Sequence, residues 1–153
     1  MTINLKRLIK SIIIPLAVGG LAALISNNNL QVENEPPLLP PAWVFPVVWT
    51  ILYILMGVAS YLILESNSSQ QEKSNALTVY GLQLVLNFFW PIIFFNLEQY
   101  LFAFIWIIAL WVMILLTILK FRPISKTASN LMIPYLIWVT FAAYLNLAIY
   151  ILN

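Results

Sequence analysis

The chain of 153 residues contains no cysteine and no histidine. Without cysteine it can form no disulfide and offers no thiolate nucleophile, and without histidine it has no imidazole acid or base and no ordinary axial ligand for haem. These two residue types are also the usual ligands of structural zinc. We therefore expect no bound metal and no resident cofactor, and any chemistry must use other side chains.

Charged residues are scarce as well. They make up 8% of the chain, whereas hydrophobic residues make up 63% and the mean hydropathy is +0.95. A soluble globular protein needs far more polar surface than this, and the length suits a single domain. The composition therefore predicts one integral membrane domain over residues 1–153.

Several apolar runs are long enough to cross a bilayer, which takes about 20 residues per helix. In lipid the backbone must satisfy its hydrogen bonds within each segment, and the alternating pattern of a membrane β-barrel is absent. The sequence therefore predicts an all-α bundle of five transmembrane helices. We place the spans near residues 8–26, 46–64, 76–95, 101–119 and 131–152.

The basic residues all fall on one side of these predicted spans. The seven are Lys6, Arg7, Lys10, Lys73, Lys120, Arg122 and Lys126. The other side carries only Glu33, Glu35 and Glu98. By the positive-inside rule the N-terminus lies inside and the C-terminus outside, and this asymmetry is typical of a bacterial plasma membrane. Because the positive charges are split among loops, we expect no nucleic-acid partner.

The first span also has the pattern of a secretory signal peptide, a basic tail followed by the apolar run 12–25. The letters that follow, ALISNNN, are a poor cleavage context, so we expect an uncleaved helix with Lys10 reaching to the membrane surface. Apart from this lysine, no charged residue lies within a predicted span. That absence disfavours ion channels, proton pumps and voltage sensors.

The stretch PPLLPPAWVFPVVWTILYILMG, residues 36–57, places five prolines and two tryptophans at the entrance of the second span. Proline lacks an amide hydrogen and is poorly tolerated inside a helix, so the segment before this span is a stiff, extended approach. The connection 27–42 is long for a link between two helices, and loops of that length are often lids or binding loops. We expect it to cap the bundle.

Three predicted spans each carry a tryptophan on one helical face, and two of these faces also carry amides. The faces are Trp49, Tyr53, Met56 and Ser60; Gln83, Asn87, Trp90 and Phe94; and Pro134, Trp138, Ala142 and Asn146. Such faces are typical of an apolar pocket with a few orienting polar groups. They also fit two structural roles, namely tryptophans at the membrane interface and amides that link helices.

Three segments in a fixed order carry a family resemblance. They are PPAWVFPVVWTILYILMG from Pro40, LNFFWPIIFF from Leu86 and PYLIWVTFAAYLN from Pro134. These segments resemble the signature segments of the TspO/translocator-protein family, whose members are also called tryptophan-rich sensory proteins or peripheral benzodiazepine receptors. The likeness extends over most of the chain.

The resemblance implies a five-helix bundle with a pocket under the first loop that binds porphyrin or other flat apolar small molecules and, in animal members, the membrane lipid cholesterol. The family's ligand-binding positions correspond to Pro40, Phe45, Trp49, Tyr53, Asn87, Trp90, Phe94, Trp138, Ala142 and Leu145. Bacterial relatives have been assigned a light-dependent breakdown of protoporphyrin, for which Trp49 and Trp138 would be the catalytic residues. The resemblance also implies a homodimer.

The chain departs from the family pattern in the loop, where the family has a Trp-Tyr pair and a Lys-Pro-x-Trp sequence. Those positions read Asn29, Leu30, Glu35, Pro36 and Leu38 here. A family acid in the fourth span is Trp106, and the last span lacks the basic residue of the cholesterol pattern. Porphyrin carboxylates thus have no lysine nearby, which makes a neutral ligand an alternative.

Three functions remain open at this stage. The first is a ligand-binding sensor or carrier for tetrapyrroles, and the second is an enzyme that breaks down bound porphyrin in light. The third is a small-molecule transporter or a structural membrane subunit, which the absence of an internal inverted repeat disfavours. The sequence contains no familiar catalytic constellation, so it does not decide whether turnover occurs.

Overall fold

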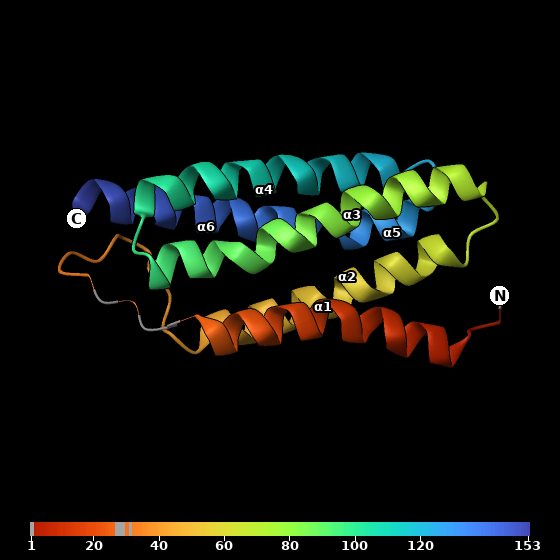
Figure 1. Cartoon of the computed structure of the whole chain (residues 1–153), viewed down its shortest axis with the longest axis horizontal. Helices are drawn as coiled ribbons and strands as arrows, with labels where there is room; N and C mark the ends of the chain where they lie inside the picture. The colour runs from red at the N-terminus through yellow and green to blue at the C-terminus, as the bar shows by residue number, and fades with distance from the viewer. Residues whose placement is uncertain (1, 27–29, 31) are drawn as a thin grey trace.

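The computed structural model describes residues 2–26, 30 and 32–153, and all regular structure in this part of the chain is helical (Figure 1). The elements are α1 (Leu5–Ile25), α2 (Val44–Leu64), α3 (Gln70–Pro91), the π-helical segment η1 (Ile92–Asn96), α4 (Tyr100–Phe121), α5 (Lys126–Leu131) and α6 (Ile133–Leu152). Five helical stretches, two of which join neighbouring elements, are long and apolar enough to cross a membrane. The prediction of an all-α membrane bundle with five spans is confirmed.

Among the helices that begin earlier than hydropathy alone predicts, α1 and α3 have polar side chains that cap their first turns. At the start of α1 the Asn4 side chain accepts a hydrogen bond from the Arg7 amide at 3.2 Å. At the start of α3 the Ser69 hydroxyl accepts one from the Glu72 amide at 3.2 Å, so this helix begins well before residue 76. Such caps satisfy amide groups that the first turn of a helix leaves free.

Two of the long helical stretches contain a break near a proline. Pro91 has no amide hydrogen, and beyond it the backbone winds more loosely, with the Leu97 amide donating to the Ile92 carbonyl at 3.1 Å. That spacing is π-helical. In the last span the break falls at Met132, between α5 and α6, and Pro134 lies in the first turn of α6, where a missing amide hydrogen is tolerated.

The helices pack as a ring. α1 lies along α2 and α3, α3 lies along α4, and α4 lies along α6. α2 closes the ring mainly against the short α5 that precedes α6. The two termini lie at opposite ends of the bundle, as an odd number of crossings requires (Figure 1). Because the backbones of α2 and α6 approach each other little, side chains must fill the space between them.

All the basic residues lie at the end of the bundle that holds the N-terminus, on the starts of α1, α3 and α5 and at the end of α4. There Arg7 forms an ion pair with Glu65, which follows α2, with 2.9 Å between Nη1 and Oε1. The loops at the opposite end carry Glu33, Glu35 and Glu98. This separation of charge is what the positive-inside rule uses, and the direction of insertion stays a prediction.

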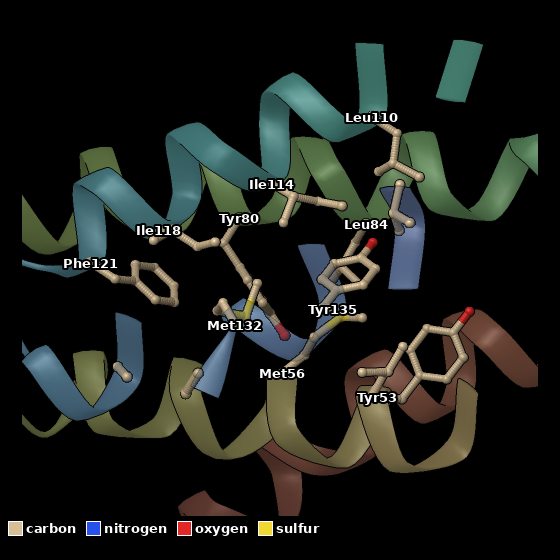
Figure 2. Packing of buried hydrophobic residues seen from close by; sticks show 14 of the residues in the cluster. Tyr53, Met56, Tyr80, Leu84, Leu110, Ile114, Ile118, Phe121, Met132 and Tyr135 are labelled. Atoms are coloured by element: carbon tan, nitrogen blue, oxygen red, sulfur yellow. The ribbon is translucent and has the colours of Figure 1, made fainter. Parts of the chain in front are cut away.

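The largest buried side chains converge in the centre of the bundle (Figure 2). Tyr135 of α6 points inward, toward Leu84 of α3 and Met56 of α2. Buried polar side chains accompany them, among them Gln83, Asn87 and Asn146. A buried polar group in a membrane bundle has no bulk water to bind, so it must find partners within the protein.

α1 and α2 approach each other closely at Gly57. A Cβ atom added there would collide with the backbone of Ile12 and would lie 2.8 Å from the Ser11 carbonyl oxygen. That carbonyl lacks its usual helical donor, because the residue four positions later is Pro15. The glycine therefore lets the two backbones touch, as small residues commonly do between membrane helices.

We expect Gly57→Ala to lower the melting temperature of the protein. Forcing a methyl group against fixed backbone costs about 1–3 kcal/mol, which exceeds the gain of up to about 1 kcal/mol in helix propensity. Gly81→Ala in α3 is the matched control, because nothing lies within 4 Å of a Cβ atom at that position. Melting of both variants in one detergent, followed by circular dichroism, measures the difference. Equal melting temperatures would contradict the close contact.

Candidate ligand-binding site

Aromatic side chains fill the space between α2 and α6. Phe45 of α2 meets Trp138 of α6 edge to face, with ring centroids 5.8 Å apart. One turn further along α2, Trp49 meets Tyr135 edge to face at 6.2 Å and stacks on Tyr53 at 5.6 Å. We call these five residues the aromatic cluster. Such ring contacts are favourable beyond the burial of their surface.

A chain of hydrogen bonds ties the aromatic cluster to α3. The Tyr53 hydroxyl donates to Asn87 Oδ1 at 2.9 Å, and Asn87 Nδ2 donates to the Tyr135 hydroxyl oxygen at 2.6 Å. The Tyr135 hydroxyl in turn donates to Gln83 Oε1 at 2.7 Å. All four side chains are buried. We call Tyr53, Asn87, Tyr135 and Gln83 the polar chain, and it connects α2, α3 and α6 without a gap.

α1 makes room for this arrangement at Gly19. A Cβ atom at that position would run into the ring of Tyr53. The ring therefore occupies space that any other residue in α1 would fill, and from there its hydroxyl reaches Asn87. The glycine in the first span thus positions a side chain of the second.

A second aromatic group lies where α3 passes into η1. Trp90 stacks on Phe94 with centroids 5.0 Å apart, and Phe94 contacts Tyr100 of α4 at the same separation. The Trp90 indole donates to Asn146 Oδ1 at 3.0 Å, and Asn146 Nδ2 donates to the Tyr100 carbonyl at 2.8 Å. Trp90 also packs against the main core that contains Tyr53, so the second group adjoins the first.

The described part of the connection between α1 and α2 is fastened to α6. The Asn34 amide donates to Asn153 Oδ1 at 3.0 Å, and Asn153 Nδ2 donates back to the Asn34 carbonyl at 2.9 Å. The Tyr144 hydroxyl donates to the Pro37 carbonyl at 2.8 Å. Leu30 packs on buried residues of η1, α4 and α6, so the loop covers this end of the bundle. Residues 27–29 and 31 lie outside the described residues, and with them Asn29, one of the positions that depart from the family pattern.

The indole nitrogens of the bundle differ in their partners. Those of Trp90, Trp106 and Trp111 each donate a hydrogen bond to a neighbouring helix. The Trp138 indole nitrogen is buried and has no hydrogen-bond partner in the described part of the chain. Because an unpaired buried donor costs about 1–3 kcal/mol, it points to a missing acceptor. The aromatic cluster therefore contains one buried donor whose hydrogen bond is unmet among the described residues.

Comparison with known proteins gives one consistent result. The pattern of the TspO/MBR family matches residues 11–152. Tryptophan-rich protein TspO of Chlorobaculum tepidum is 43% identical over 119 residues, which cover 78% of this chain and 75% of that protein.

The chain belongs to the TspO/MBR family.

Other relatives agree with this assignment over different lengths. Tryptophan-rich protein TspO of Archaeoglobus fulgidus is 38% identical over 154 residues, which cover 98% of this chain and 99% of that protein. Translocator protein of Ovis aries is 39% identical over 114 residues, which cover 74% and 68%. The family is thus matched from end to end of the bundle by one relative and across its greater part by the others.

The structure places half of the ligand-binding residues that the TspO/MBR resemblance predicts in the aromatic cluster or the polar chain. Phe45, Trp49, Tyr53 and Trp138 lie in the aromatic cluster, and Asn87 lies in the polar chain. Their proximity comes from three different helices, so it is a property of the fold. Their role in binding a ligand stays a prediction.

The remaining predicted residues lie around that centre. Trp90 and Phe94 form the second aromatic group, and Ala142 and Leu145 are buried on α6. Pro40 is half-buried at the end of the loop, and no hydrogen bond or ring contact joins it to the cluster in the described structure. The loop proline is therefore the predicted site residue with the weakest structural link to the others.

The prediction that Pro134 lies on the inner face of the last span is wrong. Pro134 is exposed, because it lies in the first turn of α6, whereas its neighbour Tyr135 is fully buried. The sequence offered a signal for Tyr135, since it precedes Trp138 by three positions and so shares its face. Among the alternatives left open by the sequence, the linking role of Asn87 and Asn146 is confirmed by their hydrogen bonds between helices.

Tyr135→Phe should destabilise the protein by about 1–3 kcal/mol, because it leaves Asn87 Nδ2 and Gln83 Oε1 buried without their partner. Tyr150→Phe, on the exposed side of α6, is the matched control and should change stability by less than about 0.5 kcal/mol. Unfolding of both variants in the same mixed micelles gives the two values. A Tyr135→Phe protein as stable as the control would show that the polar chain does not hold the bundle together.

Proposed function

We propose that this TspO/MBR protein binds a porphyrin or another flat, apolar small molecule at the aromatic cluster, and that it acts as a sensor or carrier of that molecule. The observation that carries the proposal is the unpaired indole N–H of Trp138 beside Phe45. An acceptor atom on the ligand satisfies this donor, while the ligand's rings stack on the surrounding aromatic faces.

The cluster contains a fixed part and a part that can turn. Tyr53 and Tyr135 are buried and held by the polar chain, whereas Phe45, Trp49 and Trp138 retain partial exposure. Since α2 and α6 meet here through side chains, rotation of these outer rings opens space without moving either backbone. A flat aromatic disc then takes the place of the rings that contact each other in the structure.

The charge distribution favours a ligand with little negative charge. All seven basic residues lie at the far end of the bundle, and the loops at this end carry Glu33, Glu35 and Glu98. A carboxylate on the ligand therefore finds no cation near the cluster and faces repulsion from the loop. Where the family has an acid in the fourth span, Trp106 donates to the Leu86 carbonyl at 2.8 Å.

The names of relatives support the sensor or carrier role. One of them is called Tryptophan-rich sensory protein and others are called Translocator protein, which describe those proteins. The one-sided basic charge supports insertion in a bacterial plasma membrane. A homodimer, which the resemblance implies, has an exposed apolar face available on α3 at Leu82, Val85 and Phe89.

A second candidate function is light-dependent breakdown of a bound porphyrin. It is supported by the position of Trp49 and Trp138, the two tryptophans of the aromatic cluster, on either side of the space between α2 and α6. Under this function the porphyrin absorbance falls in light, and either Trp49→Phe or Trp138→Phe abolishes the loss. Equal loss in both variants and in the unchanged protein would be free photobleaching.

The binding proposal predicts saturable quenching of tryptophan emission when the detergent-purified protein is titrated in the dark. Protoporphyrin dimethyl ester should bind at least as tightly as protoporphyrin, because the ester lacks the two carboxylates. Trp138→Phe should weaken binding of the ester by up to about tenfold, the value of one hydrogen bond. Trp43→Phe, which removes an exposed tryptophan outside the cluster, should leave the affinity unchanged.

The same titration can contradict the proposal in two ways. A flat response with folded protein would show that the cluster does not take such ligands. Equal weakening by Trp43→Phe and Trp138→Phe would indicate adsorption to exposed tryptophans at the membrane surface. Circular dichroism of each variant before titration confirms that it is folded.

A further inference from the structure

A hollow of about 600 Å³ opens at the basic end of the bundle, between the starts of α1 and α3 and the end of α2. It lies at the opposite end from the aromatic cluster and takes no part in the proposed function. Three cationic residues line it, namely Arg7, Lys10 and Lys73. The hollow is thus a separate place where an anion meets a concave, positively charged surface.

The two helices that flank the hollow present the same arrangement. In α1 the pair Lys10 and Ser11 is followed at helical spacing by Ile14, and in α3 the pair Lys73 and Ser74 is followed by Leu77. All six residues line the hollow. On each helix the cation and hydroxyl therefore lie one turn nearer the end of the bundle than the apolar side chain. The lining changes from charged to apolar in the direction of the membrane interior.

Two of the three cationic side chains that line the hollow have partners within the protein. Arg7 is paired with Glu65 at 2.9 Å, and Lys73 Nζ donates to the Leu64 carbonyl at 3.0 Å. The Lys10 side chain is exposed and has no hydrogen bond or ion pair to any described residue. The remaining acid nearby, Glu72, lies in the first turn of α3 and is exposed. The ammonium groups of Lys10 and Lys73 thus form no ion pair with a described acid.

We propose that this hollow binds the phosphate headgroup of an anionic phospholipid, with Lys10 and Lys73 at the phosphate. The hydroxyls of Ser11 and Ser74 are placed to donate hydrogen bonds to the headgroup, and an acyl chain runs down over Ile14 and Leu77. A soluble phosphate compound shares the headgroup chemistry but has no acyl chain to contact the apolar lining. The basic end of the bundle is also the end predicted to face the cytoplasm, where anionic lipids attract basic residues.

The proposal is tested by native mass spectrometry of the full chain in detergent with added dioleoyl phosphatidylglycerol. Lys10→Gln should weaken binding of this lipid about fivefold, and Lys73→Gln should do so by a similar factor. Lys126→Gln is the matched control, because it removes the same charge from the same end of the bundle but outside the hollow. Its affinity for the lipid should equal that of the unchanged protein.

Three results would overturn the proposal. Equal weakening by all three variants would indicate general attraction to the basic end. Displacement of the lipid by millimolar glycerol 3-phosphate would assign the hollow to a soluble phosphate. Equal binding of dioleoyl phosphatidylcholine and dioleoyl phosphatidylglycerol would exclude selection by headgroup charge. Lys10→Gln removes an exposed side chain without a described partner, so its fold should be intact, and a melting curve checks this.

Discussion

The side-chain amide of Asn87 links three helices in the centre of the bundle. This one side chain accepts a hydrogen bond from α2 and donates one to α6, and it does so from α3. Hydrogen bonds between membrane helices contribute about 0.6 kcal/mol on average, so their sum is small beside the packing of the whole bundle. These hydrogen bonds nevertheless fix how the helices are placed relative to one another. Breaking any of them leaves buried polar atoms with no water to replace the lost partner.

This constraint explains why the aromatic cluster has an inner and an outer part. The hydroxyls of Tyr53 and Tyr135 form hydrogen bonds in the polar chain, which hold both rings in place. Gly19 leaves the space that the Tyr53 ring occupies. The rings of Phe45, Trp49 and Trp138 lie outside that chain and contact other aromatic rings. If the three outer rings turn aside when a flat ligand binds, as proposed, the backbone need not reorganise, which keeps the cost of binding low.

Much of this architecture is predictable from the sequence, because a bilayer restricts the chain strongly. Runs of apolar residues locate the five spans, and the spacing of Trp49, Tyr53 and Asn87 along their helices predicts which faces turn inward. The break at Met132 was not predictable, because nothing in composition separates a cap at Ser125 and a short α5 from a continuous span. Pro134 is exposed because that break places it in the first turn of α6, at the end of the helix.

The sequence also does not predict which side chains form hydrogen bonds between helices. The sequence identifies Gln83, Asn87 and Asn146 as amides on apolar faces, but their hydrogen bonds depend on the order in which the helices pack around the ring. The Lys-Ser pairs of α1 and α3 can be read in the sequence, but only the structure shows that those two helices lie side by side. Packing order is a property of the whole bundle, and local patterns do not contain it.

In the proposed binding site the buried indole N–H of Trp138 donates a hydrogen bond to the ligand. The most direct measurement is the ¹⁵N–¹H spectrum of the six tryptophan indoles with and without protoporphyrin dimethyl ester, assigned by single Trp→Phe variants. On saturation the Trp138 resonance should move to the position of a hydrogen-bonded indole, while that of Trp111, bonded to Thr140 at 2.8 Å, should stay in place. A ligand that binds at saturation and leaves the Trp138 resonance unmoved would contradict the proposed hydrogen bond.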